Sequence, residues 1–321
     1  MTDSSERARQ VLGAAGIPPG DLAHLRPLGG GTYNTVEELT LTDGTRYVLK
    51  TAPTAPGLAH ERQLLISEAD FYSAAAKAGV AAPRVVVLDG DTLLMTLCPG
   101  EPWDDPLTVP EVTDLRTELG RQLALLHEIT GPGFGYPSGA LGPLAPDWRT
   151  AFTTLYDAVL DDTRRYEAWL PLPADDIART ARSAYDALDE VTIPCAVHFD
   201  LWQGNILVDR TTGTPRIGGL IDGERMFWGD PLADFVSLAL LGDIRTDEPF
   251  LAGYRDAGGR AEFDRSARLR YALYRSYLYL IMLAETVPRK FGEEENRWRR
   301  EKVAPELLAA LREIDETAST P

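Results

Sequence analysis

One short segment of the sequence carries side chains that could handle a proton and a metal ion. His198, Asp200 and Asn205 form the pattern H-x-D-x-x-x-x-N, and Asp222 follows the next apolar stretch. A carboxylate can orient an attacking hydroxyl and accept its proton, while further oxygen ligands can hold the magnesium that bridges nucleotide phosphates. This chemistry predicts that Asp200 is the base, that Asn205 and Asp222 bind Mg²⁺, and that His198 orients the loop.

The residues around this segment predict a hairpin. Short apolar strands are expected at 206–208 and 216–221, with a turn at 211–213 between them. Such a hairpin would place Asn205 and Asp222 side by side at its open end. A buried Asp or Asn in a loop more often closes a turn than binds a metal. The metal-site hypothesis therefore depends on the rest of the chain.

A glycine-rich turn near the N-terminus could approach a phosphate group. Residues 28–36 read L-G-G-G-T-Y-N-T-V, and a D-G hairpin joins the strands expected at 37–41 and 46–50. Glycine lets backbone amides approach phosphate oxygens because no Cβ stands in the way. By itself the pattern is equally typical of a flexible turn. The residues expected to contact a nucleotide here are Gly30, Gly31, Thr32 and Asn34.

Lys50 ends the strand after this turn, at a distance typical of a lysine that binds phosphates. Such a lysine needs a carboxylate to hold it. The helix expected at 64–79 carries Glu68 near its middle, and Glu61 is the alternative partner. A surface lysine and an exposed helix glutamate would be the ordinary interpretation of each residue alone. Together with the glycine-rich turn, they predict a Lys50–Glu68 pair at the nucleotide.

Taken in order, these motifs resemble the aminoglycoside phosphotransferase and fructosamine kinase superfamily. The resemblance extends from about residue 28 to 241, includes G-D-P-L-A-D at 229–234, and in D-L-W-Q-G-N at 200–205 is similar to the fructosamine kinase form. It implies an α+β, protein-kinase-like fold with two lobes. Residues 1–98 would form an N-terminal antiparallel sheet lobe with one main helix, and residues 99–321 a larger, mainly helical lobe. The Pro/Gly-rich segment 98–102 would be the linker between them.

The resemblance also implies an activity and a set of contacts. A small-molecule O-phosphotransferase would move the γ-phosphate of ATP or GTP to a hydroxyl of an antibiotic, such as an aminoglycoside. The alternative is a metabolite kinase for a glycated amine, a sugar or an amino alcohol. Backbone groups from Thr96 to Cys98 would bind the adenine edge and Met95 would line the base pocket, although core packing is nearly as typical of Met95. Asp230 and Asp234 would support the catalytic loop.

Two departures from the family pattern lie beside the expected site. Phe199 stands where Gly is common, and Asp222 is followed by G-E-R instead of an aromatic residue. Neither change removes an essential group. A protein kinase is disfavoured because an A-P-E segment is missing and the stretch from Asp222 to Asp230 is too short for an activation loop. A non-catalytic pseudokinase is disfavoured because all the essential groups are chemically competent.

Composition narrows the remaining classes. The chain has 321 residues, of which 44% are hydrophobic, and a formal net charge of −17. The acidity argues against nucleic acid and anionic membrane surfaces as partners. Two cysteines, no signal-like start and no long apolar run predict a cytoplasmic protein, expected to be a monomer or a simple homodimer.

The same acidity could attract a cationic acceptor, although it is equally typical of a surface that keeps a protein soluble. We expect a small hydroxylated acceptor and favour one that bears an amine. The carboxylates expected near it are Asp104, Asp105, Asp157, Asp161, Asp162 and Glu285. Further helices are expected near 115–130, 148–170, 174–188 and 267–284. The tyrosines of the last one could form an aromatic wall for the acceptor or pack in the core; they are Tyr271, Tyr274, Tyr277 and Tyr279.

Overall fold

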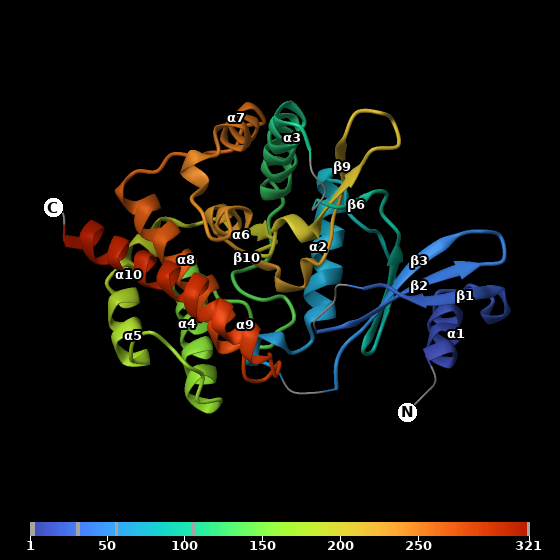
Figure 1. Cartoon of the computed structure of the whole chain (residues 1–321), viewed down its shortest axis with the longest axis horizontal. Coiled ribbons are helices and arrows are strands. Elements are labelled where there is room, and N and C mark those ends of the chain that lie inside the picture. The colour runs from blue at the N-terminus through green and yellow to red at the C-terminus, as the bar shows by residue number, and fades with distance from the viewer. Residues whose placement is uncertain (1–3, 30–32, 55–56, 104–106, 320–321) are drawn as a thin grey trace.

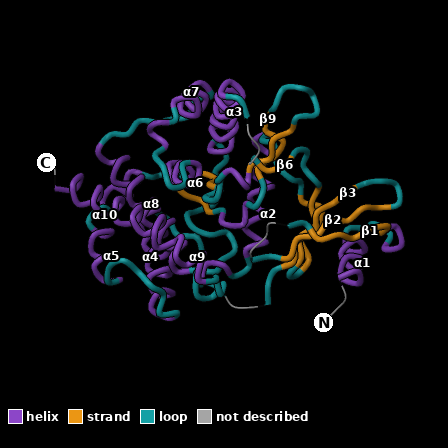
Figure 2. Tube along the Cα trace, viewed as in Figure 1, coloured by secondary structure: helices purple, strands orange, loops and turns teal. Residues whose placement is uncertain are grey.

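The structure is a computed structural model that describes residues 4–29, 33–54, 57–103 and 107–319. Most strands gather toward the N-terminal end of the molecule and most helices toward the C-terminal end (Figure 1, Figure 2). The predicted α+β architecture, with an antiparallel sheet followed by a mainly helical region, is confirmed. Among the described helices, none combines the length and the apolar character needed to cross a membrane.

The N-terminal sheet has five antiparallel strands in the order β1-β2-β3-β5-β4. They are β1 (Leu22–Pro27), β2 (Thr35–Leu41), β3 (Arg46–Thr51), β4 (Val85–Asp89) and β5 (Thr92–Thr96). Successive side chains of a strand point to opposite faces of the sheet. Leu49 therefore packs in a small core with helix α1 (Ser4–Ala14), and Lys50 belongs to the opposite face, which lines a cavity. Helix α1 was not expected from the sequence.

The predicted helix after this hairpin is α2 (Leu64–Ala78), which packs against β4, β5 and the turn after Asp222. It ends at Gly79, whose φ of 69° is left-handed and whose amide donates to the carbonyls of Ala75 and Ala76. A glycine in this position closes a helix without steric strain. The side of α2 that carries Glu68 is buried beneath Lys50.

The C-terminal region is built mainly from helices. They are α3 (Val109–His127), α4 (Trp148–Arg165), α5 (Ala174–Arg182), α6 (Asp234–Leu238), α7 (Glu248–Asp256), α8 (Arg265–Ala284), α9 (Glu293–Trp298) and α10 (Ala304–Ser319). Helix α4 stops earlier than expected at its C-terminal end, and α5 gives way to a 3₁₀ segment at Tyr185–Glu190. Side chains cap the N-termini: Asp147 accepts from the amide of Thr150 at 2.8 Å, and Asp264 from that of Ala267 at 2.8 Å.

Two small sheets hold residues 195–229, called the catalytic segment below because they include the residues predicted to act in catalysis. One contains β6 (Glu101–Pro102), β8 (Ile206–Asp209) and β9 (Arg216–Leu220), and the other pairs β7 (Cys195–Val197) with β10 (Phe227–Gly229). The expected hairpin is therefore present as β8 and β9. A Cβ on Gly218 would lie 2.1 Å from the carbonyl oxygen of Pro99, so only glycine lets the linker pass this close to β9.

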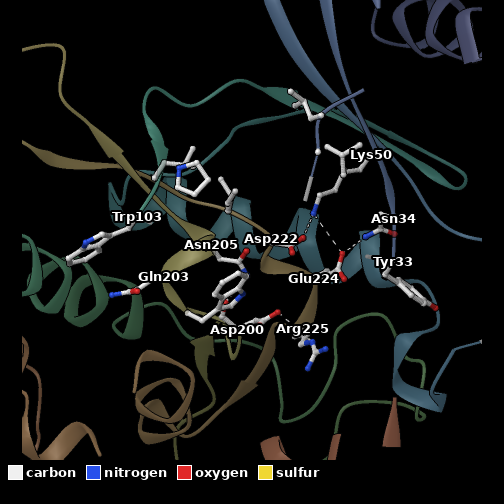
Figure 3. A pocket seen from close by; sticks show the side chains of 18 of the residues that line it. Tyr33, Asn34, Lys50, Trp103, Asp200, Gln203, Asn205, Asp222, Glu224 and Arg225 are labelled. Atoms are coloured by element: carbon white, nitrogen blue, oxygen red, sulfur yellow. Dashed lines mark hydrogen bonds and ion pairs between the residues drawn. The ribbon is translucent and has the colours of Figure 1, made fainter. Parts of the chain in front are cut away.

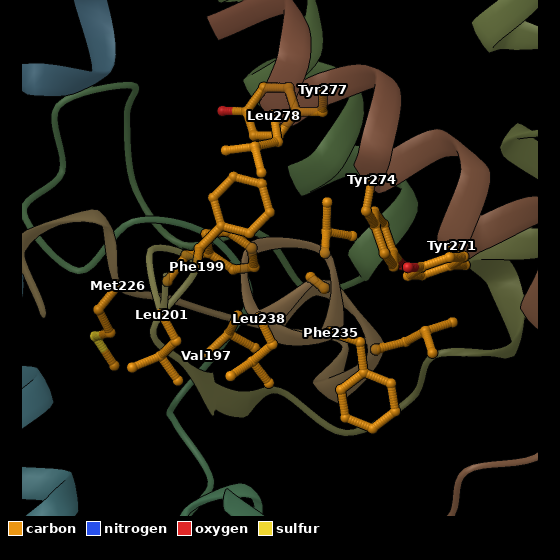
Figure 4. Packing of buried hydrophobic residues seen from close by; sticks show 14 of the residues in the cluster. Val197, Phe199, Leu201, Met226, Phe235, Leu238, Tyr271, Tyr274, Tyr277 and Leu278 are labelled. Atoms are coloured by element: carbon orange, nitrogen blue, oxygen red, sulfur yellow. The ribbon is translucent and has the colours of Figure 1, made fainter. Parts of the chain in front are cut away.

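The tyrosines of α8 belong to the core. Tyr271, Tyr274 and Tyr277 are fully buried, and so is Tyr279. Figure 4 shows Tyr271, Tyr274 and Tyr277 among apolar side chains that include Phe199 and Phe235, and the rings of Tyr277 and Phe199 lie 5.5 Å apart. None of these tyrosines is among the described residues that line the main cavity. Of the two alternatives for these tyrosines, core packing is therefore the one observed, because they point into the interior of the protein.

Candidate active site

A cavity of about 1670 Å³ lies where the N-terminal sheet meets the helical region. It brings together most of the residues predicted to carry the chemistry. The predicted residues that line it are Asn34, Lys50, Met95, Thr96, Cys98, Asp200, Asn205 and Asp222. Glu68 lies directly behind Lys50 and is fully buried. Gly30, Gly31 and Thr32 fall outside the described residues. Figure 3 shows the polar side chains of this cavity.

Lys50 pairs with Glu68, at 2.7 Å between Nζ and Oε1. The hydroxyl of Tyr72 donates to the same carboxylate oxygen at 2.6 Å. The alternative partner, Glu61, instead contacts Arg289 at 2.5 Å. The strand and the helix therefore select Glu68 and not Glu61 as the partner of Lys50. A fixed pair of this kind holds the ammonium where a phosphate can reach it.

Two further carboxylates surround the same ammonium. Lys50 hydrogen-bonds Asp222, and its Nζ lies 3.7 Å from Oε2 of Glu224. Burial alone would lower the pKa of Lys50, but Asp222, Glu68 and Glu224 raise it well above its usual value. Burial and the charge of Asp222 raise the pKa of Glu224 to about 8. The lysine is therefore charged at neutral pH, and Glu224 is largely protonated.

Glu224 is a site residue that was not predicted from the sequence. It accepts a hydrogen bond from Nδ2 of Asn34, which follows the glycine-rich turn, so it joins that loop to the Asp222 turn. The signal in the sequence is its position two residues after Asp222, where the family pattern often has an aromatic residue. Oδ1 of Asn34 is buried and has no hydrogen-bond partner in the described part of the chain.

The catalytic loop is held by local hydrogen bonds. The amide of Asp200 donates to Nδ1 of His198 at 3.2 Å, and Nε2 of His198 lies 2.9 Å from the carbonyl oxygen of Ile221. Because Nδ1 must accept, Nε2 carries the proton and donates to Ile221. This imidazole therefore ties the loop of Asp200 to the residue before Asp222. The arrangement suits an orienting role for His198.

The donor set at Asn205 and Asp222 fits a magnesium ion. Nδ2 of Asn205 donates to the carbonyl of Asp200 at 2.8 Å, which turns its Oδ1 away from that contact and leaves it available. The amide of Ile221 donates to the carbonyl of Asn205 at 3.0 Å, so Asn205 and the Asp222 turn are neighbours. Carboxylate and amide oxygens are the ligands that Mg²⁺ prefers. Glu68, Asp222 and Glu224 also converge, but the ammonium of Lys50 lies among them.

Asp234 and Asp230 lie beneath the loop. Asp234 is fully buried and accepts from the amides of His198 at 3.0 Å and Phe199 at 2.6 Å. Asp230 accepts from the amide of Leu232 and contacts Arg270 at 2.9 Å. Neither aspartate is among the described residues that line the cavity. Their contacts agree with the supporting roles that the resemblance implies.

Phe199 combines backbone strain with good packing. Its φ is 63°, a left-handed conformation that is unfavourable for a bulky residue, yet its ring is fully buried, 5.1 Å from that of Phe227. Substitution to Gly relieves about 1–2 kcal/mol of strain but forfeits about 3–5 kcal/mol of packing. We expect Phe199→Gly to lower the free energy of unfolding by about 1–4 kcal/mol. Urea unfolding measures this, with Phe199→Leu as the packed control; a stabilised glycine variant would contradict it.

The environment of Asp200 differs from that of a surface aspartate. Burial raises its pKa, whereas the nearby guanidinium of Arg225 lowers it. Nε of Arg225 lies 3.6 Å from Oδ2 of Asp200, and Nη2 of Arg225 lies 2.9 Å from Glu285. Because burial outweighs Arg225, the pKa of Asp200 is raised, and this more basic carboxylate lines the cavity. Such a group suits proton acceptance from a hydroxyl.

The carboxylates expected to attract a cationic acceptor lie mostly elsewhere. Asp157, Asp161 and Asp162 belong to α4, where they contact Arg182, Arg164 and Arg165, respectively. Glu285 is the one described member of that set that lines the cavity, and three guanidiniums surround it. Asp104 and Asp105 fall outside the described residues. The α4 carboxylates are therefore structural, because they pair with arginines of their own region.

The nucleotide side of the cavity contains the predicted linker residues. Met95 is 2% exposed and lines the cavity, so it belongs both to the core and to the cavity wall. The amide of Thr96 donates to the carbonyl of Arg84 at 2.9 Å, which leaves it unavailable for a base. In the described part of the chain, Cys98 has no backbone hydrogen bond of this kind. Among the described residues, the backbone of Cys98 is therefore less engaged than the amide of Thr96.

Two curated proteins are similar in sequence to this chain. The chain is 26% identical over 272 residues to a protein of Lactiplantibacillus plantarum assigned as a ketoamine kinase, covering 81% of this chain and 90% of that protein. It is 31% identical over 194 residues to viomycin phosphotransferase of Streptomyces vinaceus, covering 56% of this chain and 61% of that protein.

The same fold occurs among solved structures. A protein of Thermobifida fusca assigned as a fructosamine-3-kinase superposes with a TM-score of 0.71 at 22% identity, over 97% of this chain and 100% of the other. The model of the phosphotransferase enzyme family matches residues 24–273, which include the glycine-rich turn, Lys50 and the whole catalytic segment. The chain therefore belongs to the phosphotransferase enzyme family.

Proposed function

We propose that this protein transfers the γ-phosphate of ATP or GTP to a hydroxyl of a small molecule. The observation that carries the proposal is the convergence of Lys50, Asp200, Asn205 and Asp222 on one cavity. These groups supply a phosphate-binding cation, a base and two metal ligands, which are the parts that phosphoryl transfer requires. The N-terminal lobe, residues 1–98, would bind the nucleotide, and residues 99–321 would bind the acceptor.

Each residue of the site has a separate role in the proposed mechanism. Lys50, held by Glu68, binds the α- and β-phosphates, while backbone groups at Cys98 bind the base. Asn205 and Asp222 would hold Mg²⁺, which neutralises charge on the phosphates when it is bound. Asp200 orients the acceptor hydroxyl and takes its proton as the new bond to phosphorus forms and the bond to the nucleotide diphosphate breaks. The bound hydroxyl is already positioned, so little further covalent chemistry is needed.

Two classes of acceptor follow from the relatives. An antibiotic is one class, as for the viomycin phosphotransferase, and a glycated amine or related metabolite is the other, as for the ketoamine kinase. The match to the ketoamine kinase covers 90% of that protein and the match to the viomycin enzyme 61%. Because the match to the ketoamine kinase is longer, metabolites are tested as a second class of acceptor in addition to antibiotics.

The purified protein should phosphorylate a hydroxyl of at least one member of a panel that contains aminoglycosides, other hydroxylated antibiotics, ketoamines, sugars and amino alcohols. Each acceptor is tested with ATP and with GTP in the presence of Mg²⁺, and the product is identified by mass and by ³¹P NMR. Asp200→Asn serves as the inactive control. Nucleotide hydrolysis without phosphate on any acceptor would contradict the proposal.

A further inference from the structure

Beyond Asp200, the cavity wall is formed by a cluster of buried charges. Arg225 is 7% exposed and Glu285 is 4% exposed, and both line the cavity together with Arg289. Oε2 of Glu285 lies 2.9 Å from Nη2 of Arg225 and 3.3 Å from Nη2 of Arg289. Two guanidiniums therefore converge on one carboxylate oxygen. Figure 3 shows Arg225 beside Asp200, where an acceptor hydroxyl would have to bind.

Hydrogen-bond donors exceed acceptors in this cluster. A guanidinium has five N–H donors, whereas the two oxygens of a carboxylate offer about four acceptor positions. In the described part of the chain, Arg225 makes one hydrogen bond, to Glu285. Arg299 also contacts Glu285, at 3.2 Å, but donates in addition to Glu295 and to the carbonyl of Met282, so it anchors α9. Arg225 is therefore the buried cation with donors left for a bound molecule.

The buried carboxylates near the cluster already have partners. Glu285 contacts three guanidiniums, and Glu61 pairs with Arg289 at 2.5 Å. Glu224 lies on the Lys50 side, where it bonds Asn34. Oδ2 of Asp200 lies 3.6 Å from Nε of Arg225, and in the proposed mechanism this carboxylate accepts the proton of the acceptor hydroxyl. Around Arg225 the buried carboxylates are thus paired while donors of this arginine stay open, and the exposed carboxylates of Glu294 and Glu301 also line the cavity.

We propose that Arg225 binds a carboxylate carried by the acceptor, close to the hydroxyl that Asp200 activates. This inference rests on the proposed function and specifies the substrate class of the same site. The planar fork of a guanidinium matches a carboxylate in geometry as well as charge. The acceptor is accordingly a hydroxylated carboxylic acid, such as a ketosyl amino acid, and not a simple polyamine. This adds a carboxylate to the amine-bearing acceptor that the net charge favours.

Matched acceptor pairs test the inference whatever the natural substrate is. Each pair contains a hydroxylated carboxylic acid and its uncharged carboxamide: fructosyl-glycine and fructosyl-glycinamide, glycerate and glyceramide, serine and serinamide. With the wild-type enzyme, the acid of a pair should have a kcat/KM on the order of 10–100-fold higher than its amide, the usual weight of a charge-assisted hydrogen bond. The difference should appear mainly in KM.

Variants then show whether Arg225 causes the preference for the acid over the amide. Arg225→Gln should reduce the acid-to-amide ratio to about 1–3, and Arg225→Lys should restore part of it because the charge remains. Arg297→Gln is the matched control, since Arg297 is an exposed arginine that lines the same cavity. The control should keep the wild-type ratio. A purely structural role for Arg225 would lower the rates of both members of a pair equally and leave the ratio unchanged.

The outcomes separate the carboxylate subsite from the kinase assignment. A wild-type enzyme that uses amides as well as acids, or a preference that survives in Arg225→Gln, overturns the carboxylate subsite while the kinase assignment stands. The carboxylate subsite is also overturned if the best acceptor is an amine without a carboxylate and its KM does not change in Arg225→Gln. Failure to phosphorylate any panel member with either nucleotide overturns the proposed function and this inference with it.

Discussion

Substitution of Asp200 by Asn should lower kcat by a factor on the order of 10²–10⁴, the usual contribution of a positioned general base. The amide keeps the size of the side chain, but it cannot accept the proton of the hydroxyl. Nucleotide affinity should remain nearly unchanged, because Lys50 and the linker bind the nucleotide in the proposed mechanism. Steady-state kinetics measures kcat, and equilibrium titration with a fluorescent nucleotide analogue measures affinity.

A matched control exists on the neighbouring strand. Asp209 closes the turn of the β8–β9 hairpin by accepting from the amide of Thr211 at 2.9 Å, and it is not among the described cavity-lining residues. Asp209→Asn should therefore leave kcat within about threefold of wild type, as expected of a substitution away from the reacting groups. An unchanged kcat in Asp200→Asn would remove this residue from the mechanism.

The second large effect concerns magnesium. Asp222→Ala should abolish productive Mg²⁺ binding, whereas Asn205→Ala should only raise the Mg²⁺ concentration needed for activity. The carboxylate contributes a full charge to the ion and the amide contributes a dipole. Asp222 also bonds Lys50, so its loss removes a partner of the phosphate-binding cation. Activity titrated against Mg²⁺ at saturating nucleotide measures the requirement of each variant.

Glu224 supplies the control for this experiment. It shares the ammonium of Lys50 with Asp222, but its raised pKa, about 8, makes it largely neutral at pH 7. Glu224→Gln should therefore change the magnesium requirement by no more than about threefold, because it replaces a neutral acid with a neutral amide of similar shape. Thermal unfolding of all three variants shows that each is folded. An unshifted magnesium curve for Asn205→Ala would count against its assignment as a ligand.

Local patterns predicted neighbouring residues of the site in both halves of the chain. The strand expected at 46–50 placed Lys50 at its end, after the glycine-rich turn, and the helical pattern placed Glu68 on the helix that follows. The turn at 211–213 was enough to bring Asn205 and Asp222 together across the β8–β9 hairpin. These relationships depend on backbone geometry over short separations, which residue types and spacing determine directly.

Other features depended on segments far apart in the sequence. Arg225, Glu285 and Arg289 meet only because α8 packs against the catalytic segment, and no local pattern indicates which of many charged residues will face each other. For the same reason, the tyrosines of α8 could not be assigned to the core or the cavity from their spacing.

The left-handed backbone at Phe199 and Asp222 depends on tertiary structure in the same way. Both have a φ of 63°, which is unfavourable for the bulky Phe199 and better tolerated by an aspartate. Each is held by distant partners: Asp234 accepts from the amide of Phe199, and the hydroxyl of Tyr72 accepts from the amide of Asp222. The sequence by itself determined which groups could perform phosphoryl transfer and how neighbouring ones are spaced. The tertiary structure decided how burial and long-range charge pairing tune them, because those energies arise only when distant segments exclude water together.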